Sequence, residues 1–245
     1  MFDPVLLNYN AFDLLLLFVA VVLMPLLSAL AGAQLAKGAP GERRLIARYW
    51  QTLARGWIVV ALVAAVWHVL GRPFAELGVA PHLGAWDIAG TGAVALVALP
   101  LIVQLLRLKT LPPERLAKAM KRFDRIKVTP TTRSELTVFI LVAITAGVWE
   151  ELLYRGFLIW FLVPLAGVGG GIVLSALVFG LGHAYQGAAG ILSTTLIGLA
   201  FAALYVLSGT LWWLMAAHAL IDIYGGLTAW RVKQLAAQQG VLRAP

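Results

Sequence analysis

The sequence has no cysteine and few charged residues, and both shortages narrow the classes of protein it can encode. The absence of cysteine excludes disulfides, thiolate metal sites and cysteine nucleophiles, and leaves the redox compartment open. Charged residues make up 12% of the chain, against roughly a quarter in soluble proteins, while 61% are hydrophobic and the mean hydropathy is +0.89. This composition predicts a multi-pass integral membrane protein.

Long apolar runs predict an all-α, polytopic membrane helical bundle. Most of these runs are near the ~20 residues that cross a bilayer, so we expect about seven membrane-spanning helices, or eight if the fourth run breaks in two. The pattern ERLAKAMKRF at 114–123 predicts a short basic amphipathic helix on the anionic cytoplasmic surface, although a solvated linker helix fits it equally well. The runs are 12–33, 53–70, 88–106, 136–166, 171–181, 191–207 and 211–230.

The net charge of +8 is concentrated in short segments beside the apolar runs. Residues 34–55 are rich in Lys and Arg and are expected in the cytoplasm, whereas residues 71–87 carry one basic residue and are expected on the other side. Membrane topology therefore explains the charge better than a nucleic-acid partner does. We expect the lipid bilayer as a partner, no nucleic acid, and a location in the cell (plasma or inner) membrane.

The chain divides by character into three parts, and its first apolar run is not expected to be a cleaved signal. Residues 1–10 contain Asp3 and no Lys or Arg, unlike a basic signal-peptide start. We expect N-terminal helices and basic loops at 1–135, a functional membrane core at 136–230 and a short basic tail at 231–245, all in one membrane domain. Thr and Ser residues within 129–135, with Pro130, predict the start of the first core helix.

The stretch GVWEELLYRGF at 147–157 places three charges within an apolar run. Charges at membrane depth are expensive, so they are usually paired, face the bundle interior and serve function. Glu151 and Arg155 are four residues apart and can pair on one helix face. Glu150, about 100° around the helix, is then left as the unpaired carboxylate.

Two later apolar runs repeat the four-residue spacing with other functional side chains. His218 and Asp222 share one helix face, and Phe179 and His183 share another. Each pair alone could be structural, for example as a hydrogen-bonding histidine between helices. Together, a carboxylate and two imidazoles from three helices supply a general base, a proton carrier and hydrogen-bond donors.

These segments resemble a known family of membrane proteins. EELLYR (150–155), FGLGH (179–183) and HALID (218–222) are similar, in order, to the EExxxR, FxxxH and HxxxN/D motifs of the CAAX-protease and bacteriocin-processing (CPBP, or Abi) proteins. The eukaryotic member of that family is the CAAX prenyl endopeptidase of the endoplasmic reticulum. The resemblance covers roughly residues 135–226, and the ordered triple is more specific than any single motif.

The resemblance implies an intramembrane endopeptidase of the glutamate type, acting on a membrane-associated protein or peptide. Glu150 would act as general base on a water held jointly with His183. His218 with Asp222 would stabilise the oxyanion of the tetrahedral intermediate. An ionised Asp222 cannot donate a hydrogen bond, so it would have to be protonated or instead orient His218.

The remaining motif residues, Glu151, Arg155 and Phe179, would support the site, and no cofactor is expected. Two alternatives remain open at this stage. In the first, zinc is bound by the four polar residues of the cluster, although the HExxH signature is absent and Arg155 would disfavour a dication. In the second, the same groups serve a non-catalytic transporter, scaffold or immunity protein. The four zinc-ligand candidates are Glu150, His183, His218 and Asp222.

Overall fold

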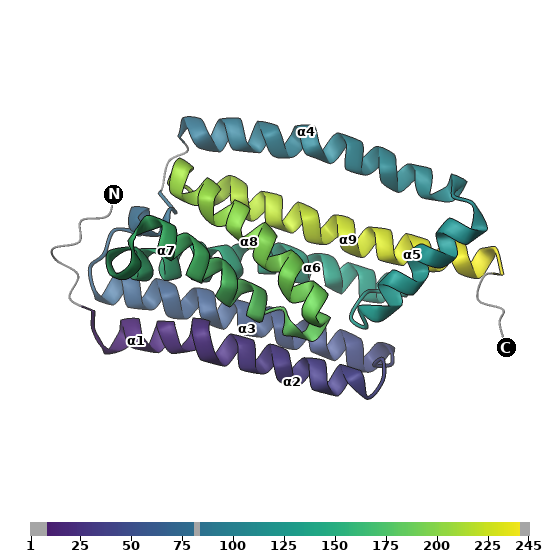
Figure 1. Cartoon of the computed structure of the whole chain (residues 1–245), viewed down its shortest axis with the longest axis horizontal. Helices are drawn as coiled ribbons and strands as arrows, with labels where there is room; N and C mark the ends of the chain where they lie inside the picture. The colour runs from purple at the N-terminus through teal and green to yellow at the C-terminus, as the bar shows by residue number, and fades with distance from the viewer. Residues whose placement is uncertain (1–8, 81–83, 241–245) are drawn as a thin grey trace.

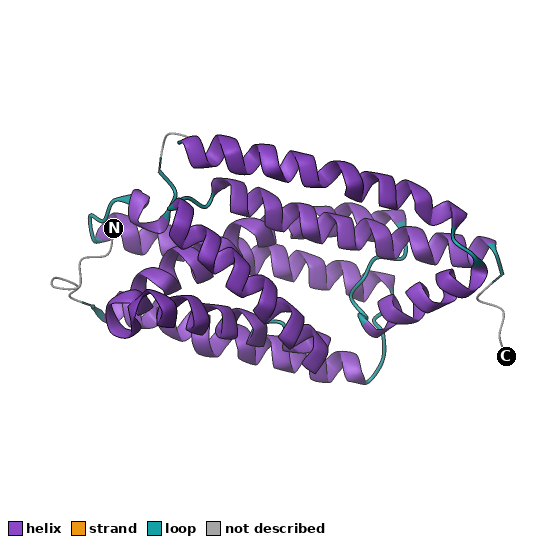
Figure 2. Cartoon of the chain, turned by 45° about the horizontal axis from the view of Figure 1, so that its top comes forward, coloured by secondary structure: helices purple, strands orange, loops and turns teal. Residues whose placement is uncertain are grey.

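The computed structural model describes residues 9–80 and 84–240, except for the side chain of Arg125. Within these ranges the chain is helical and contains no strand, which confirms the predicted all-α membrane bundle (Figure 2). The helices lie roughly along one long axis, and the two ends of the described chain are at opposite ends of the bundle (Figure 1).

The N-terminal half forms three long rods. The first begins at a capping box between Asn10 and Asp13 and runs through α1 (Ala11–Phe18), the π-helical turn η1 (Val19–Leu23) and α2 (Met24–Ala36). It is followed by α3 (Glu42–Val69) and α4 (Ala85–Arg107). Short 3₁₀ turns, η2 (Phe74–Leu77) and η3 (Leu108–Thr110), lie beside the ends of α3 and α4.

The C-terminal half contains a long rod, a hairpin and a final helix. Its elements are α5 (Pro113–Arg125), α6 (Arg133–Glu150), η4 (Glu151–Leu158), α7 (Ile159–Leu181), η5 (Ala184–Gln186), α8 (Ala188–Ser208) and α9 (Trp212–Gln238). The predicted helix start is confirmed, because the Thr132 hydroxyl accepts from the Glu135 amide in a capping box. The tail expected at 231–245 is partly helical, since α9 continues to Gln238; residues 241–245 lie outside the described residues.

The fourth apolar run does not break in two. α6, η4 and the first part of α7 form one continuous rod, and the chain reverses at Gly167, whose φ of 70° lies in the left-handed region that favours glycine. The remainder of α7 returns along this rod: the Ser175 hydroxyl donates to the carbonyl of Tyr154 at 2.7 Å. α7 and α8 then form an antiparallel hairpin.

Among the described residues, five helical segments are long and apolar enough to cross a bilayer, fewer than the expected number of about seven but in agreement with an integral membrane protein. α9 is not among them, since His218 and Asp222 lower its hydropathy, yet it packs between α6 and α4 (Figure 1). The five segments are Ala11–Ala36, Glu42–Val69, Ala85–Thr110, Arg133–Leu181 and Ala188–Ser208.

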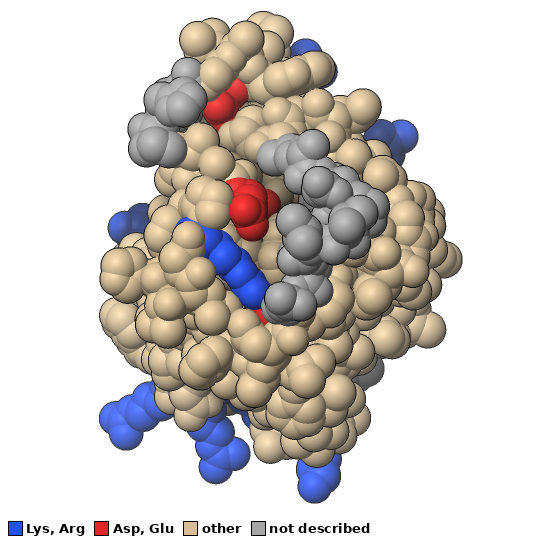
Figure 3. Space-filling view, turned by 90° about the vertical axis from the view of Figure 1, so that its left-hand side faces the viewer, with Lys and Arg blue, Asp and Glu red and all other residues tan. Residues whose placement is uncertain are grey.

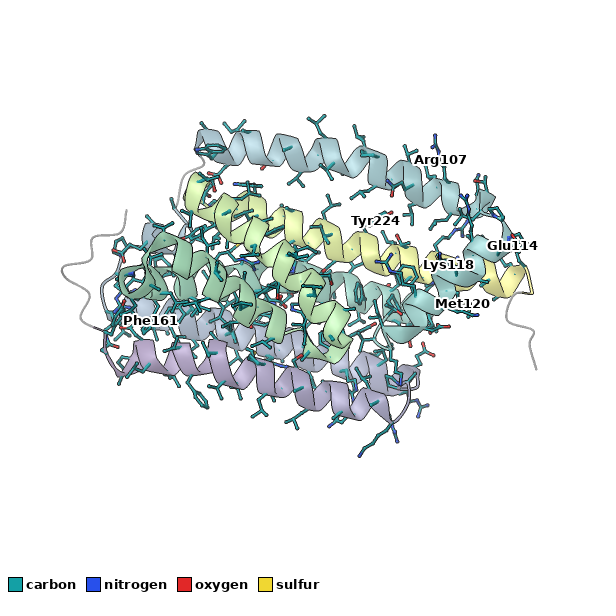
Figure 4. All side chains as sticks on the ribbon, viewed as in Figure 1. Arg107, Glu114, Lys118, Met120, Phe161 and Tyr224 are labelled. Atoms are coloured by element: carbon teal, nitrogen blue, oxygen red, sulfur yellow. The ribbon has the colours of Figure 1, made fainter. Side chains whose placement is uncertain are left out.

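The basic residues gather at one end of the bundle. Arg107 and Lys118 lie at this end with α5, whereas Phe161 lies at the opposite end (Figure 4). The surface of that opposite end is mostly uncharged (Figure 3). The charge asymmetry agrees with the expected alternation of cytoplasmic and non-cytoplasmic loops.

The predicted basic helix is present as α5, but its apolar face is buried against protein. Leu116 is fully buried in a small cluster with Val232, Leu235 and Ala236 of α9. Arg115 and Lys118, on the other face, are exposed. α5 therefore lies across the basic end of the bundle and packs the connection between α4 and α6 against α9.

Candidate active site

The EELLYR motif lies where the α6 rod changes from α-helical to π-helical geometry. Glu150 is the last residue of α6, and Glu151 is the first residue of the π-helical segment η4. Such segments are rare and frequently occur at functional sites. The sequence predicted a helix here without indicating the π-helical turn.

The predicted pairing of Glu151 with Arg155 is confirmed. Nη1 of Arg155 donates to Oε1 of Glu151 at 3.0 Å, and their side chains are 1% and 0% exposed. Nη2 of Arg155 donates to the carbonyl of Gly198 on α8 at 3.4 Å. The guanidinium also lies 4.2 Å from the ring centroid of Phe179 on α7. Arg155 thus links η4, the segment that carries most of the EELLYR motif, to the α7–α8 hairpin.

His218 on α9 is held by Glu151. Its Nδ1 lies 2.7 Å from Oε1 of Glu151. A carboxylate at this distance accepts the hydrogen bond, so Nδ1 carries the proton. Nε2 of His218 faces the other carboxylates of the cluster, 3.8 Å from Oε2 of Glu150 and 3.7 Å from Oδ2 of Asp222.

His183 lies in the turn between α7 and α8, directly after the end of α7. Its Nδ1 is 2.9 Å from the carbonyl oxygen of Phe179, which fixes the proton on Nδ1 because a carbonyl only accepts. The ring of Phe179 stands 4.7 Å from the imidazole, as the four-residue spacing predicted. Nε2 of His183, which then has a free lone pair, lies 3.8 Å from Oε2 of Glu150.

Glu150 is the point at which these contacts meet. Its Oε2 is buried and has no hydrogen-bond partner in the described part of the chain, and it faces Nε2 of both His183 and His218. The Asp222 side chain is 39% exposed and forms the open edge of the cluster, whereas the Glu150 side chain is 12% exposed. The structure therefore brings all four predicted catalytic side chains together.

Small residues let the helices that carry the site approach each other. A Cβ on Gly147 would stand 2.6 Å from the carbonyl oxygen of Met215 on α9, so glycine is needed for this contact. A Cβ on Gly198 would stand 3.0 Å from the Phe179 ring. Small residues in apolar runs permit such close packing, although they do not indicate which helices meet.

Arg55 of α3 is an additional charged neighbour that the sequence analysis did not assign to the site. Its guanidinium is close enough to Glu150 to interact with it electrostatically. The next residue, Gly56, packs against the indole of Trp149, which places this part of α3 beside the motif helix. The sequence feature that could have indicated this role is the position of Arg55, two residues after the start of the second apolar run (53–70).

Zinc binding by Glu150, His183, His218 and Asp222 stays an alternative prediction. Among the described residues, no group of three or more His, Asp or Glu side chains is spaced to hold a metal ion. Nδ1 of His218 bonds to Glu151 and Nδ1 of His183 to a backbone carbonyl, and the Nε2 atoms of both histidines face Glu150.

The fold and the site together define an integral membrane protein with a buried glutamate and histidine cluster formed by three helical segments. Residues 132–224 match the family model of type II CAAX prenyl endopeptidase Rce1-like proteins. This match confirms the family indicated by the three motifs and supports a membrane endopeptidase of the CAAX-protease type. Comparisons with curated proteins and with solved structures give no significant match.

Proposed function

We propose that this protein is a glutamate-type intramembrane endopeptidase that hydrolyses a peptide bond of a membrane-associated protein or peptide. The observation that carries the proposal is the position of Glu150: its Oε2 has no hydrogen bond among the described residues and faces Nε2 of His183 at 3.8 Å. An acid and an imidazole with free acceptor atoms at this separation can share one water molecule, because each hydrogen bond spans about 2.8 Å.

The attacking water donates one hydrogen to each of these acceptors. Oε2 of Glu150 accepts one O–H, and Nε2 of His183 accepts the other because its Nδ1 proton is held by Phe179. A lone pair of the water oxygen is then directed at the scissile carbonyl carbon. As the C–O bond forms, the water proton moves to Glu150, which acts as general base.

Collapse of the tetrahedral intermediate returns that proton to the substrate. The C–N bond breaks, and Glu150 delivers the proton to the leaving nitrogen, so that one water adds across one peptide bond. His218 in its protonated form would point an Nε2–H toward the site, because Glu151 holds its Nδ1. We propose that this cation stabilises the oxyanion and that the nearby Asp222 carboxylate, 3.7 Å from Nε2, keeps the imidazole protonated.

The mechanism needs no metal or organic cofactor. Glu151, Arg155 and Phe179 act as positioning residues, because they fix the imidazole of His218 and the α7–α8 hairpin. The substrate is expected to reach the site from the bilayer of the cell membrane, and it can be prenylated or unmodified.

The test is peptide cleavage by the purified protein in nanodiscs. Membrane-anchored reporter peptides with and without a prenyl group are incubated with wild type and with His183→Ala, and products are identified by mass spectrometry. His68→Ala, which changes an exposed histidine of α3, is the matched control. We expect cleavage by wild type and His68→Ala, with or without a chelator, and none by His183→Ala. Cleavage by His183→Ala at the wild-type rate, or loss of wild-type activity on chelation that zinc restores, would overturn the mechanism.

A further inference from the structure

Tyr154, within the EELLYR motif, has no role in the mechanism above, yet it lies among the catalytic side chains. It is 2% exposed, and its ring packs edge-on against Phe179 at 5.3 Å. The same Phe179 ring lies 4.7 Å from the imidazole of His183 and 6.0 Å from that of His218. Tyr154 therefore shares one aromatic neighbour with both catalytic histidines.

The hydroxyl of Tyr154 lies beside the α7–α8 turn that carries His183. It lies 3.1 Å from the position that a Cβ on Gly182 would occupy, directly before His183 in the α7–α8 turn. It is also close enough to Glu150 to interact electrostatically with that carboxylate. The phenol thus lies next to the backbone that precedes His183 and within electrostatic range of Glu150.

Tyr154 differs from the other five tyrosines in its hydrogen bonding. Each of those has a hydroxyl hydrogen bond, whereas the Tyr154 hydroxyl has none to any described residue. The Tyr154 hydroxyl is thus a hydrogen-bond donor that no described residue uses. The other five hydroxyls bond to Phe161, Val128, Gln186, Glu76 and Gln104, from Tyr9, Tyr49, Tyr185, Tyr205 and Tyr224 respectively.

The cluster also has many acceptors and few free donors. Glu150 and Asp222 only accept when ionised, and His183 presents a lone pair at Nε2 because its Nδ1 proton is bonded to a carbonyl. The Nδ1 proton of His218 is likewise bonded to Glu151, so His218 offers the oxyanion only the Nε2–H that the mechanism above assigns to it. An oxyanion that develops here needs donors, and a free phenolic O–H supplies one.

We propose that Tyr154 is a further catalytic residue that donates a hydrogen bond from its hydroxyl to the substrate carbonyl oxygen as that oxygen becomes the oxyanion. The assignment rests on the proposed peptidase function. The phenol keeps its proton throughout and forms no covalent bond to the substrate. The hydrogen bond is strongest in the tetrahedral state, so it lowers the barrier more than it aids substrate binding.

Tyr154→Phe tests the assignment because it removes only the hydroxyl. We expect kcat on the membrane-anchored reporter peptide to fall by about 10²- to 10³-fold with KM nearly unchanged, as when one oxyanion donor is lost. Binding of a phosphinate analogue of the same peptide, which mimics the tetrahedral state, should weaken, whereas binding of the uncut peptide to a Glu150→Gln background should not. Tyr205→Phe, a buried tyrosine whose hydroxyl contacts Glu76 instead, is the matched control and should keep wild-type kinetics.

The outcomes separate this proposal from the proposed function. If wild type cleaves, Glu150→Gln does not, and Tyr154→Phe matches wild type in kcat and phosphinate affinity, the tyrosine assignment is wrong while the mechanism stands. If wild type cleaves no reporter, the proposed function and the tyrosine assignment are both wrong. A Tyr154→Phe protein that loses affinity for phosphinate and uncut peptide equally would show a structural role and also overturn the assignment.

Discussion

Oε1 of Glu151 accepts two hydrogen bonds from different helices, one from Nδ1 of His218 at 2.7 Å and one from Arg155 at 3.0 Å. One buried carboxylate oxygen therefore joins α9 to the motif helix and sets the orientation of the His218 imidazole. The supporting pair predicted from the sequence is thus in direct contact with a proposed catalytic group.

Glu151→Gln should lower both activity and stability. The amide cannot fix the imidazole as a carboxylate does, and loss of an orienting carboxylate costs about 10²- to 10⁴-fold in kcat at catalytic histidines. Arg155 would also be left as an uncompensated buried charge, which lowers the free energy of unfolding by about 3–5 kcal/mol. Cleavage assays well below the melting temperature, with thermal unfolding in detergent, measure the two effects. Glu114→Gln on the exposed face of α5 should change neither, and a Glu151→Gln protein with wild-type kcat would exclude the orienting role.

Asp222→Asn should have a smaller effect. Its Oδ2 lies 3.7 Å from Nε2 of His218, beyond hydrogen-bond distance, and its side chain is 39% exposed. Because Glu151 already fixes the ring, we expect kcat to fall by less than about tenfold, which is roughly 1.4 kcal/mol. The same cleavage assay compares the two variants. A loss as large as that of Glu151→Gln would show that Asp222 is the group that orients His218.

Gly147→Ala should separate the two helices that bring Glu150 and His218 together. The added Cβ would lie 2.6 Å from the carbonyl oxygen of Met215, so α6 and α9 must move apart. Overpacking of this kind costs about 1–3 kcal/mol of stability. We expect lower resistance to thermal unfolding and lower activity. Gly225→Ala on α9, where the Cβ would meet no atom within 4 Å, is the control; equal effects of the two substitutions would contradict the packing argument.

The parts of the site that lie on single helices could be predicted from the sequence. The pairs Glu151 with Arg155 and Phe179 with His183 follow from helical periodicity, because residues four apart share a face. Both pairs are in contact in the structure. The helix start near Thr132 could likewise be predicted, because its capping box is formed by local hydrogen bonds.

Contacts between helices could not be predicted in the same way. The bond from His218 to Glu151 depends on how α9 packs against α6, and periodicity within one helix carries no information on that. Arg55 was assigned to a basic loop, but α3 begins at Glu42 and carries it to the site. The basic pattern of α5 similarly indicated an amphipathic helix without showing that α9 covers Leu116.

The most direct test of the central claim is single-turnover cleavage of the reporter peptide by Glu150→Gln in nanodiscs. Glutamine keeps the size of the side chain but cannot take a proton from water, so we predict a fall in rate of at least about 10²-fold. Thermal unfolding should match wild type, because Oε2 of Glu150 makes no hydrogen bond to any described residue. Cleavage by folded Glu150→Gln at the wild-type rate would contradict the proposal that Glu150 activates the water.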